Sequence, residues 1–279
     1  MASIAAGSVY GVAKGALIYG VKVLDCSGSG TIFTVLAGLD MVASQRSPTR
    51  STIINLSLNA PSDSALNDEV SALVLESGIA VVVAAGNSHA DACRYSPSGA
   101  PNVLTVTATD ENDSLATDFA NYGNCVPLAA PGVNTIAAWG TSDTAVASTT
   151  GTSMASPQVA GDVALEWEFI PNKLDAVAAI NAVLTRATRN IVTHVPSGPV
   201  PALLYSRQAA GALPPPPPPP GGNSIPGLPP NPPPQPPPNL VDNPVDSAPV
   251  NNGTKDTPEF QPLVAIVTSL GLFLWLQVM

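Results

Sequence analysis

A serine at the start of a predicted buried helix is the best candidate in this sequence for a reactive side chain. Ser153 lies in the stretch Gly151-Thr152-Ser153-Met154-Ala155-Ser156-Pro157, which predicts a turn that becomes a helix of small and apolar residues. The free N–H groups and the positive dipole end of such a helix can stabilise an oxyanion formed beside the hydroxyl. The alternative is that Ser153 only caps the helix.

A second stretch offers a donor for the same oxyanion. In Ala84-Ala85-Gly86-Asn87, the two alanines end a continuous apolar run over residues 79–85, and Gly86 and Asn87 follow it. A glycine lets the backbone approach a ligand closely, and an asparagine amide donates hydrogen bonds. Taken alone, however, Gly86 and Asn87 would be interpreted as an ordinary turn.

Residues 151–161 resemble the nucleophile motif of the subtilisin-like serine proteases, especially the proteinase K-like branch. The usual motif of that branch is Gly-Thr-Ser-Met-Ala-Thr-Pro-His-Val-Ala-Gly, and nine of its eleven positions match here. Ser156 replaces the motif's second threonine, and Gln158 replaces its histidine. The resemblance extends over residues 2–207. It implies that Ser153 is the nucleophile, and that Asn87 and the Ser153 N–H form the oxyanion hole.

The general base of such an enzyme has no counterpart in the sequence. The family orders its triad as Asp, His and Ser along the chain, and residues 2–14 resemble the segment that follows its His motif. The resemblance therefore implies that both motifs lie upstream of Met1. The sequence has two histidines, His89 and His194, and neither matches the family's base. Because nothing can accept the serine proton, we expect the chain as written to be inactive or nearly so.

The resemblance also implies a substrate cleft. Two edge segments would pair with an extended peptide by β-augmentation, a binding mode that accepts many sequences. The second segment departs from the family, because Asn59 and Ala60 replace glycines, which predicts a narrower cleft. The implied substrate-binding residues are Gly28, Ser29, Gly30, Ser57, Leu58, Asn59, Ala85 and Gly86. Asp25 and Asp40 match family positions without a catalytic role.

The sequence contains three cysteines, which permit at most one internal disulfide. The resemblance implies a bond between Cys93 and Cys125, because thermophilic bacterial relatives of proteinase K have cysteines at both positions. Such a bond fits an extracellular compartment, and it leaves Cys26 without a partner. Pro127 replaces the carboxylate of the family's calcium site, so we expect that site to be lost or weak. We therefore expect no cofactor and no metal-ligating residue.

Apolar runs and helical periodicities alternate along the first two thirds of the chain. This alternation predicts an α/β fold, a parallel sheet with helices on both faces. The resemblance specifies a subtilisin-like three-layer fold that lacks its N-terminal part. Asp162 and Glu166 lie in the serine helix, where buried and unpaired carboxylates would be costly. The predicted strands cover residues 16–24, 52–58, 79–85 and 103–108, with a short closing strand at 203–205; the predicted helices cover residues 32–43, 67–76, 153–169 and 173–186.

The composition changes after the peptidase-like domain, which we place at residues 1–207. Residues 208–261 are rich in proline and predict a disordered stalk of polyproline II character. Residues 262–279 form a hydrophobic tail, of which the last 17 residues carry no charge. Small residues, a polar spacer and such a tail are typical of a GPI-anchor signal, with Asn252 as the attachment residue. A short membrane anchor and a packed terminal helix are the alternatives.

The net charge and the expected extracellular location limit the kinds of molecule that the protein can bind. The net charge is −10 with only ten Lys and Arg residues, so we expect no nucleic-acid binding. We expect protein or peptide substrates, a membrane link through the anchor and a monomeric state. The localisation that follows is secreted, on the cell surface or cell wall. Because the first residues do not form a signal peptide, we also expect a missing front segment. Asn112 is a glycosylation site on a predicted loop, whereas the sequon at Asn55 lies in a core strand.

Three functions remain open. The first is a serine endopeptidase of the subtilisin-like family. The second is a truncated pseudo-protease that acts as a surface-anchored binding or cell-wall protein. In the third, the proline-rich region is itself the functional part, as a ligand for proline-binding domains.

Overall fold

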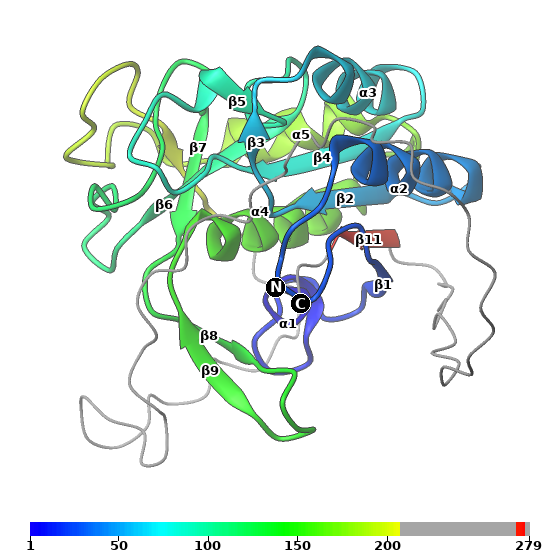
Figure 1. Cartoon of the computed structure of the whole chain (residues 1–279), viewed down its shortest axis with the longest axis horizontal. Helices are drawn as coiled ribbons and strands as arrows, with labels where there is room; N and C mark the ends of the chain where they lie inside the picture. The colour runs from blue at the N-terminus through cyan, green and yellow to red at the C-terminus, as the bar shows by residue number, and fades with distance from the viewer. Residues whose placement is uncertain (207–271, 277–279) are drawn as a thin grey trace, which may run out of the picture.

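A parallel sheet of seven strands forms the centre of the molecule (Figure 1). The computed structural model describes residues 1–206 and 272–276. All neighbouring strands of the sheet pair in parallel, which confirms the predicted sheet type. In spatial order the strands are β1 (Leu17–Val21), β11 (Leu272–Leu276), β2 (Thr52–Leu56), β4 (Ile79–Ala84), β6 (Leu104–Thr109), β7 (Leu128–Pro131) and β10 (Ala202–Leu203).

Helices cover both faces of this sheet, as the alternating pattern predicts. In Figure 1, α2 (Ile32–Gln45) and α3 (Ser64–Leu75) lie above the sheet, whereas α4 (Thr152–Trp167) lies below it. The long α4 crosses β2, β4, β6 and β7, and contacts both α1 (Ala2–Ala6) and α5 (Ala176–Arg186). The central helix thus brings its first turn close to the ends of several strands.

Most predicted elements are present, with shifted ends. The strand predicted at 79–85 is β4, and every one of its residues is buried, as a continuous apolar run requires. The helix predicted at 67–76 begins earlier, at Ser64, because the Asp63 side chain accepts a hydrogen bond from the Leu66 N–H at 2.8 Å. Leu75, the last residue of this helix, is 59% exposed.

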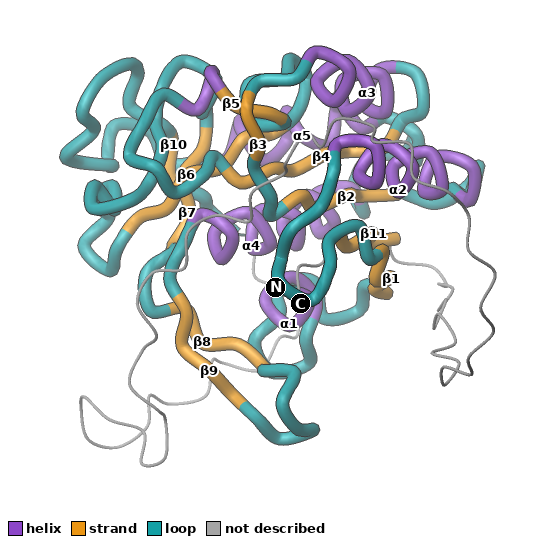
Figure 2. Tube along the Cα trace, viewed as in Figure 1, coloured by secondary structure: helices purple, strands orange, loops and turns teal. Residues whose placement is uncertain are grey.

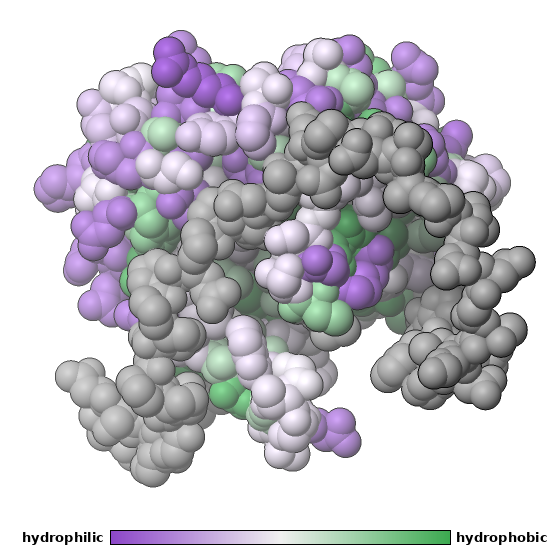
Figure 3. Space-filling model, in the orientation of Figure 1, coloured by the Kyte–Doolittle hydropathy of each residue, from purple (hydrophilic) through white to green (hydrophobic). Residues whose placement is uncertain are grey.

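Two small antiparallel sheets were not predicted. One pairs β3 (Ala60–Pro61) with β5 (Tyr95–Ser96), next to a short 3₁₀ turn at Ala92–Arg94. The other is a hairpin of β8 (Thr135–Ala138) and β9 (Val146–Thr149), which leads into α4. Figure 2 shows that this hairpin projects away from the main sheet. Figure 3 shows apolar atoms on it, where Ile136 and Val146 stay partly exposed.

The two acidic residues of α4 are buried, and Glu166 forms an ion pair. Asp162 is 0% exposed and Glu166 is 3% exposed. The Glu166 Oε1 atom lies 2.9 Å from the Arg186 Nε atom of α5. The Arg186 guanidinium also lies over the Tyr205 ring, 5.4 Å from its centroid. Glu166 therefore avoids the cost of a buried and unpaired carboxylate.

Removing the cation from this pair should destabilise the domain. We expect Arg186→Met to lower the free energy of unfolding by about 3 kcal/mol, because it leaves a buried carboxylate without its partner. Urea denaturation measures the change. The double variant Arg186→Met/Glu166→Gln should recover part of the loss, and equal stability of Arg186→Met and the unchanged chain would contradict the pairing.

Several predictions concern residues outside the described ranges. They include the proline-rich stalk at 208–261, the attachment residue Asn252 and most of the tail. Of the tail, residues 272–276 form β11, a strand instead of the terminal helix that was one alternative. Within residues 1–206 and 272–276, none of the helices combines the length and the apolar character of a membrane span.

Candidate active site

The segments that follow β2 and β4 meet the first turn of α4 at one edge of the sheet. Because β2 and β4 are paired parallel neighbours, their carboxyl ends lie side by side. Together the three segments line a shallow, open hollow. It is lined by Ser57, Leu58, Asn59, Ala84, Gly86, Asn87, Thr152 and Ser153. The structure thus brings together the proposed nucleophile, the proposed oxyanion asparagine and one of the two substrate-edge segments.

Ser153 is the second residue of α4 and does not cap it. The N-cap residue is Gly151, whose φ of 151° and ψ of 162° suit glycine. The Ser153 side chain is partly exposed, and its Oγ donates a long hydrogen bond of 3.4 Å to the Ser57 carbonyl. The capping interpretation of Ser153 is therefore wrong. The Ser153 residue lines the hollow, and its hydroxyl makes only this long hydrogen bond among the described residues.

The backbone N–H of Ser153 is available to a ligand. Of its neighbours in the first turn, the Thr152 N–H donates to Asn87 Oδ1 at 2.9 Å and the Met154 N–H donates to the Gly151 carbonyl at 3.0 Å. No hydrogen bond within the described residues uses the Ser153 N–H, as expected for one of the first amides of a helix. It lies at the positive end of α4, a helix of 16 residues.

The Asn87 side chain is oriented by Thr152. Asn87 Oδ1 accepts two hydrogen bonds, from the Thr152 N–H and from the Thr152 hydroxyl, each at 2.9 Å. The Thr152 Oγ1 atom in turn accepts from the Gly86 N–H at 3.1 Å. Since one end of the amide is held in this way, the opposite end, the Nδ2 donor, is fixed toward the hollow. Among the described residues, Asn87 Nδ2 donates to none.

Close packing explains the two glycines beside this amide. Gly86 has a φ of 101°, and a Cβ atom there would lie 2.5 Å from Asn121 Nδ2 and 2.7 Å from Asn59 Nδ2. A Cβ atom on Gly151 would lie 3.2 Å from Asn87 Nδ2. Gly151 therefore lets Asn87 approach the start of α4, and Gly86 leaves room for the side chains of Asn59 and Asn121.

Asn121 is a scaffold residue that the sequence did not reveal. It is fully buried, and its Oδ1 accepts from the N–H groups of Ser88 and Ala90 at 2.9 and 3.0 Å. Its Nδ2 donates to the Ala85 carbonyl at 2.9 Å. One side chain thus fixes the loop that carries Asn87 on both sides. A lone asparagine 34 positions along the chain gives no sequence signal for this contact.

Asn59 also supports this loop from the side. It is 8% exposed, and its Nδ2 donates to the Ala85 carbonyl at 3.3 Å and to the Ser98 hydroxyl at 3.4 Å. The side chain therefore joins the two strand-end segments. Because the Asn59 side chain makes these contacts with Ala85 and Ser98, its amide group does not by itself predict a narrower substrate cleft.

A buried hydrogen-bond chain lies beneath the nucleophile. Asn55 Nδ2 donates to Ser57 Oγ at 2.9 Å. Ser57 Oγ lies 3.2 Å from the Ser153 carbonyl oxygen and 3.0 Å from Ser156 Oγ. These contacts fasten the first turn of α4 to the end of β2. Asn55 is 0% exposed, which agrees with the expectation that its sequon stays unmodified.

The segment Gly28-Ser29-Gly30 does not line the hollow. It forms a turn in which Asp25 Oδ1 accepts from the N–H groups of Ser27 and Ser29 at 2.8 and 2.9 Å. The Ser27 hydroxyl, followed by the Ser29 N–H, holds the pKa of the Asp25 carboxyl below its ordinary value. Asp25 thus organises a turn, in keeping with the expectation that it is not a triad member.

Neither histidine is a base for Ser153. The His89 ring packs edge-on against Tyr122, with the ring centroids 5.5 Å apart. His194 Nδ1 lies 3.0 Å from Ser114 Oγ and 3.1 Å from Thr193 Oγ1. The only side-chain hydrogen bond of Ser153 in the described part of the chain goes to a carbonyl. The candidate site therefore combines the Ser153 hydroxyl with unused N–H donors, and neither His89 nor His194 contacts Ser153.

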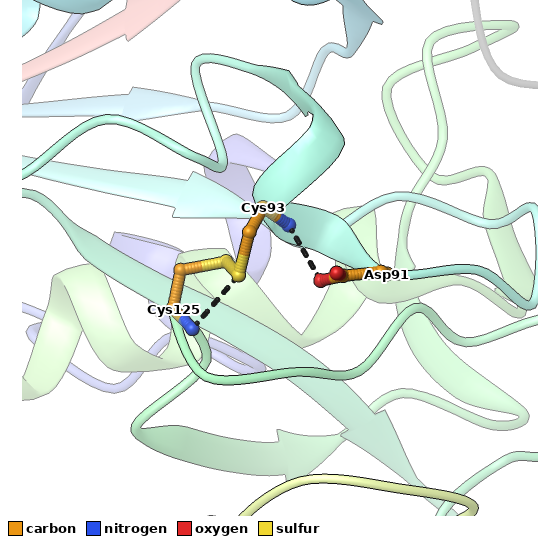
Figure 4. Close-up of side chains that lie close together, drawn as sticks. All are labelled: Asp91, Cys93 and Cys125. Atoms are coloured by element: carbon orange, nitrogen blue, oxygen red, sulfur yellow. Dashed lines mark hydrogen bonds between the residues drawn. A yellow bond between two sulfur atoms is a disulfide. The ribbon is translucent and has the colours of Figure 1, made fainter.

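The predicted disulfide between Cys93 and Cys125 is confirmed (Figure 4). Cys26 is free and exposed, as expected. Asp91 lies beside the disulfide, and its Oδ1 accepts from the Cys93 N–H at 3.0 Å. Although these three side chains lie close together, both sulfurs are used in the covalent bond, so the cluster offers only one carboxylate to a metal.

Loss of this disulfide should reduce stability strongly. The bond joins residues 32 positions apart, so the chain-entropy estimate for Cys93→Ser/Cys125→Ser is a loss of about 3–4 kcal/mol. Guanidinium denaturation of this variant measures the loss. Cys26→Ser is the matched control and should leave the midpoint unchanged; equal midpoints for the two variants would contradict a structural role of the bond.

Comparisons with known proteins agree with this geometry. The family model described as the subtilase family, peptidase S8, matches residues 1–206. An extracellular serine proteinase of Thermus sp. is 42% identical over 200 residues, which cover 72% of this chain and 48% of the relative. A cuticle-degrading protease of Metarhizium anisopliae is 42% identical over 201 residues, or 71% of this chain and 50% of the relative. The chain thus spans about half the length of these curated relatives.

A solved structure is also similar. The crystal structure of a cold adapted subtilisin-like serine proteinase superposes with a TM-score of 0.68 at 40% sequence identity. The match covers 74% of this chain and 72% of that one. The similarity therefore includes the strand ends and the helix that build the hollow.

Proposed function

We propose that this chain, which belongs to the subtilase family, carries the nucleophile and the oxyanion hole of a serine endopeptidase. One observation carries the proposal. Two hydrogen-bond donors, Asn87 Nδ2 and the Ser153 N–H, are left unused at the hollow that holds the Ser153 hydroxyl. Such donors stabilise the negative oxygen of a tetrahedral intermediate in acyl transfer.

The proposed reaction assigns a step to each of these groups. Ser153 Oγ attacks the carbonyl carbon of a peptide bond, and the carbonyl oxygen becomes an oxyanion between the two donors. The serine proton passes to a histidine, which returns it to the leaving amine as the C–N bond breaks. Water then hydrolyses the acyl-serine ester by the same steps in reverse order. The Ser57–Asn59 and Ala85–Gly86 segments hold the extended substrate beside Ser153.

Within this proposal the 279-residue chain by itself is inactive or nearly so. The reaction needs a histidine and an orienting aspartate, and the described residues place neither of the chain's histidines beside Ser153. We propose that the family's Asp and His motifs are encoded upstream of Met1. The lack of a histidine beside Ser153 also favours the second candidate, a pseudo-protease that binds proteins without cleaving them.

Translation of the genomic DNA upstream of the Met1 codon distinguishes the two candidates. The endopeptidase proposal expects a His-Gly-Thr-His motif and an Asp-Thr-Gly or Asp-Ser-Gly strand there, in frame or across an intron. An upstream region without either motif would refute the endopeptidase and leave the pseudo-protease.

The proposed setting is extracellular. The Thermus relative is named an extracellular proteinase, and the disulfide suits an oxidising compartment. We propose a monomer that is secreted and GPI-anchored at Asn252, with no cofactor, because Pro127 cannot supply the carboxylate of the family's calcium site. Release of the surface protein by phosphatidylinositol-specific phospholipase C tests the anchor. Retention after complete cleavage of a control GPI protein would refute it.

A further inference from the structure

The side chains of Asp91, Cys93 and Cys125 bring a carboxylate and two sulfurs together. Their donor atoms all lie within 4.8 Å of one another. Figure 4 shows that the three side chains come from two separate segments of the chain. In the oxidised chain the disulfide uses both sulfurs, so the cluster can act as a set of three metal ligands only after reduction.

Hydrogen bonds outside the disulfide hold these two segments together. The Tyr122 N–H donates to the Ala90 carbonyl at 3.1 Å, and the Ala92 N–H donates to the Tyr122 carbonyl at 2.8 Å. Asp91 and Tyr122 also form a parallel β-bridge. Because this pairing does not involve sulfur, we expect the three side chains to stay close together when the sulfur–sulfur bond is broken.

The local contacts of the three side chains suit metal ligands. The Cys125 N–H donates to Cys93 Sγ at 3.1 Å, and a hydrogen bond to sulfur favours the thiolate. The Cys93 N–H donates to Asp91 Oδ1 at 3.0 Å, which orients the carboxylate. A Cβ atom on Gly123 would clash with Asp91 Oδ1 and lie 3.5 Å from Cys93 Sγ. The glycine therefore leaves open space beside two of the three donor atoms.

We propose that reduction of the disulfide creates a zinc site, in which the Cys93 and Cys125 thiolates and the Asp91 carboxylate bind the metal. Thiolates and carboxylates are ligands that Zn²⁺ takes in tetrahedral sites, and water completes the fourth position here. The same two segments are then fastened covalently in the oxidised chain and by zinc in the reduced chain. This inference does not rest on the proposed peptidase function.

The conversion needs a reductant of the dithiol class. A dithiol transfers two electrons and two protons to the disulfide, so the bond between the cysteine sulfurs breaks and the dithiol becomes a cyclic disulfide. Binding of Zn²⁺ then releases the two thiol protons to solvent and leaves both thiolates on the metal. A newly synthesised chain contains the same two thiols before they are oxidised, a step that takes seconds to hours.

Titration of the reduced full-length chain with Co²⁺ tests the ligand set. The Cys26→Ser background removes the third thiol, and the chain is reduced with a water-soluble phosphine that is then removed under nitrogen. We expect a thiolate-to-cobalt charge-transfer band that saturates at one Co²⁺ per chain, that Zn²⁺ abolishes and that the oxidised chain does not show. Absence of this band from the folded, reduced chain would overturn the proposal.

Two variants in the same background test the carboxylate. Asp91→Asn keeps an oxygen that can accept from the Cys93 N–H but removes the charged ligand, so the Kd for Co²⁺ should rise by roughly tenfold or more. Asp118→Asn changes an exposed carboxylate outside the cluster and should leave the Kd unchanged. Equal affinities of the two variants would contradict Asp91 as a ligand and overturn the site as proposed.

Thermal unfolding gives a readout that is independent of the cobalt spectrum. With Zn²⁺ at about a hundredfold excess over its Kd, the unfolding temperature of the reduced Cys26→Ser chain should rise by roughly 5–10 °C. A cooperative transition that appears only after Zn²⁺ is added would also support the proposal. Further replacement by Cys93→Ser/Cys125→Ser should abolish the effect of zinc. The same unfolding with and without Zn²⁺, or an equal effect of Zn²⁺ when both cysteines are replaced, would refute the site.

Discussion

Supplying the missing acid–base pair should raise peptidase activity by roughly 10⁶-fold, the loss known for removal of the catalytic serine or histidine of subtilisin, a member of this family. The change is a chimera in which an upstream segment with the family's Asp and His motifs, taken from the Thermus relative, is joined to Ala2. The gain is expected because Ser153 already faces two unused oxyanion donors. Hydrolysis of a peptide p-nitroanilide measures kcat.

The controls for this chimera distinguish a chimera that does not fold from one that folds but is inactive. The same chimera with Ser153→Ala should return to the activity of the unmodified chain. Circular dichroism and a cooperative thermal transition report that the chimera is folded. A folded chimera that is no more active than the 279-residue chain would contradict the assignment of Ser153 as the nucleophile.

In the same chimera, removal of the proposed oxyanion amide should lower kcat strongly, although by less than removal of a triad member. We expect Asn87→Ala to lower kcat by about 10²–10³-fold with little change in KM, a magnitude measured on subtilisin itself. Thr152→Val should lower kcat by roughly tenfold, because it removes one of the two hydrogen bonds that orient Asn87. Asn87→Ala removes a donor that acts mainly in the transition state, whereas Thr152→Val keeps this donor but loosens its orientation.

A matched asparagine provides the control. Asn102 is a loop residue whose Nδ2 donates to Ser71 Oγ at 2.8 Å, and it does not line the hollow. Asn102→Ala should leave kcat within twofold of the parent chimera. If Asn87→Ala and Asn102→Ala had equal effects, the Asn87 amide could not be the oxyanion donor.

The sequence predicted those parts of the fold whose signal is local. The continuous apolar run at 79–85 is β4, and the helical periodicity at 32–43 is α2. Ser153 and Asn87 lie together as the two motifs imply. In each case neighbouring residues carry the signal, either as a periodicity or as a short motif.

The parts that the sequence did not reveal depend on contacts between distant residues. Thr152 orients Asn87 from 65 positions away, and Asn121 fixes the same loop from the other side. The salt bridge of Glu166 requires an arginine on the next helix. The strand β11 was not predicted: the tail was interpreted as a GPI-anchor signal, with a membrane anchor and a packed helix as alternatives, because an apolar run does not indicate whether its partner is a lipid or a sheet.

The central claim is that this chain assembles a nucleophile and an oxyanion hole without a general base. Reaction of the unmodified 279-residue chain with a fluorophosphonate probe tests it most directly, with Ser153→Ala as the control and subtilisin as the positive reference. We predict that the chain is labelled no more than the Ser153→Ala variant over a time in which subtilisin is labelled completely. Labelling that depends on Ser153 would show that a base is present and would contradict the account.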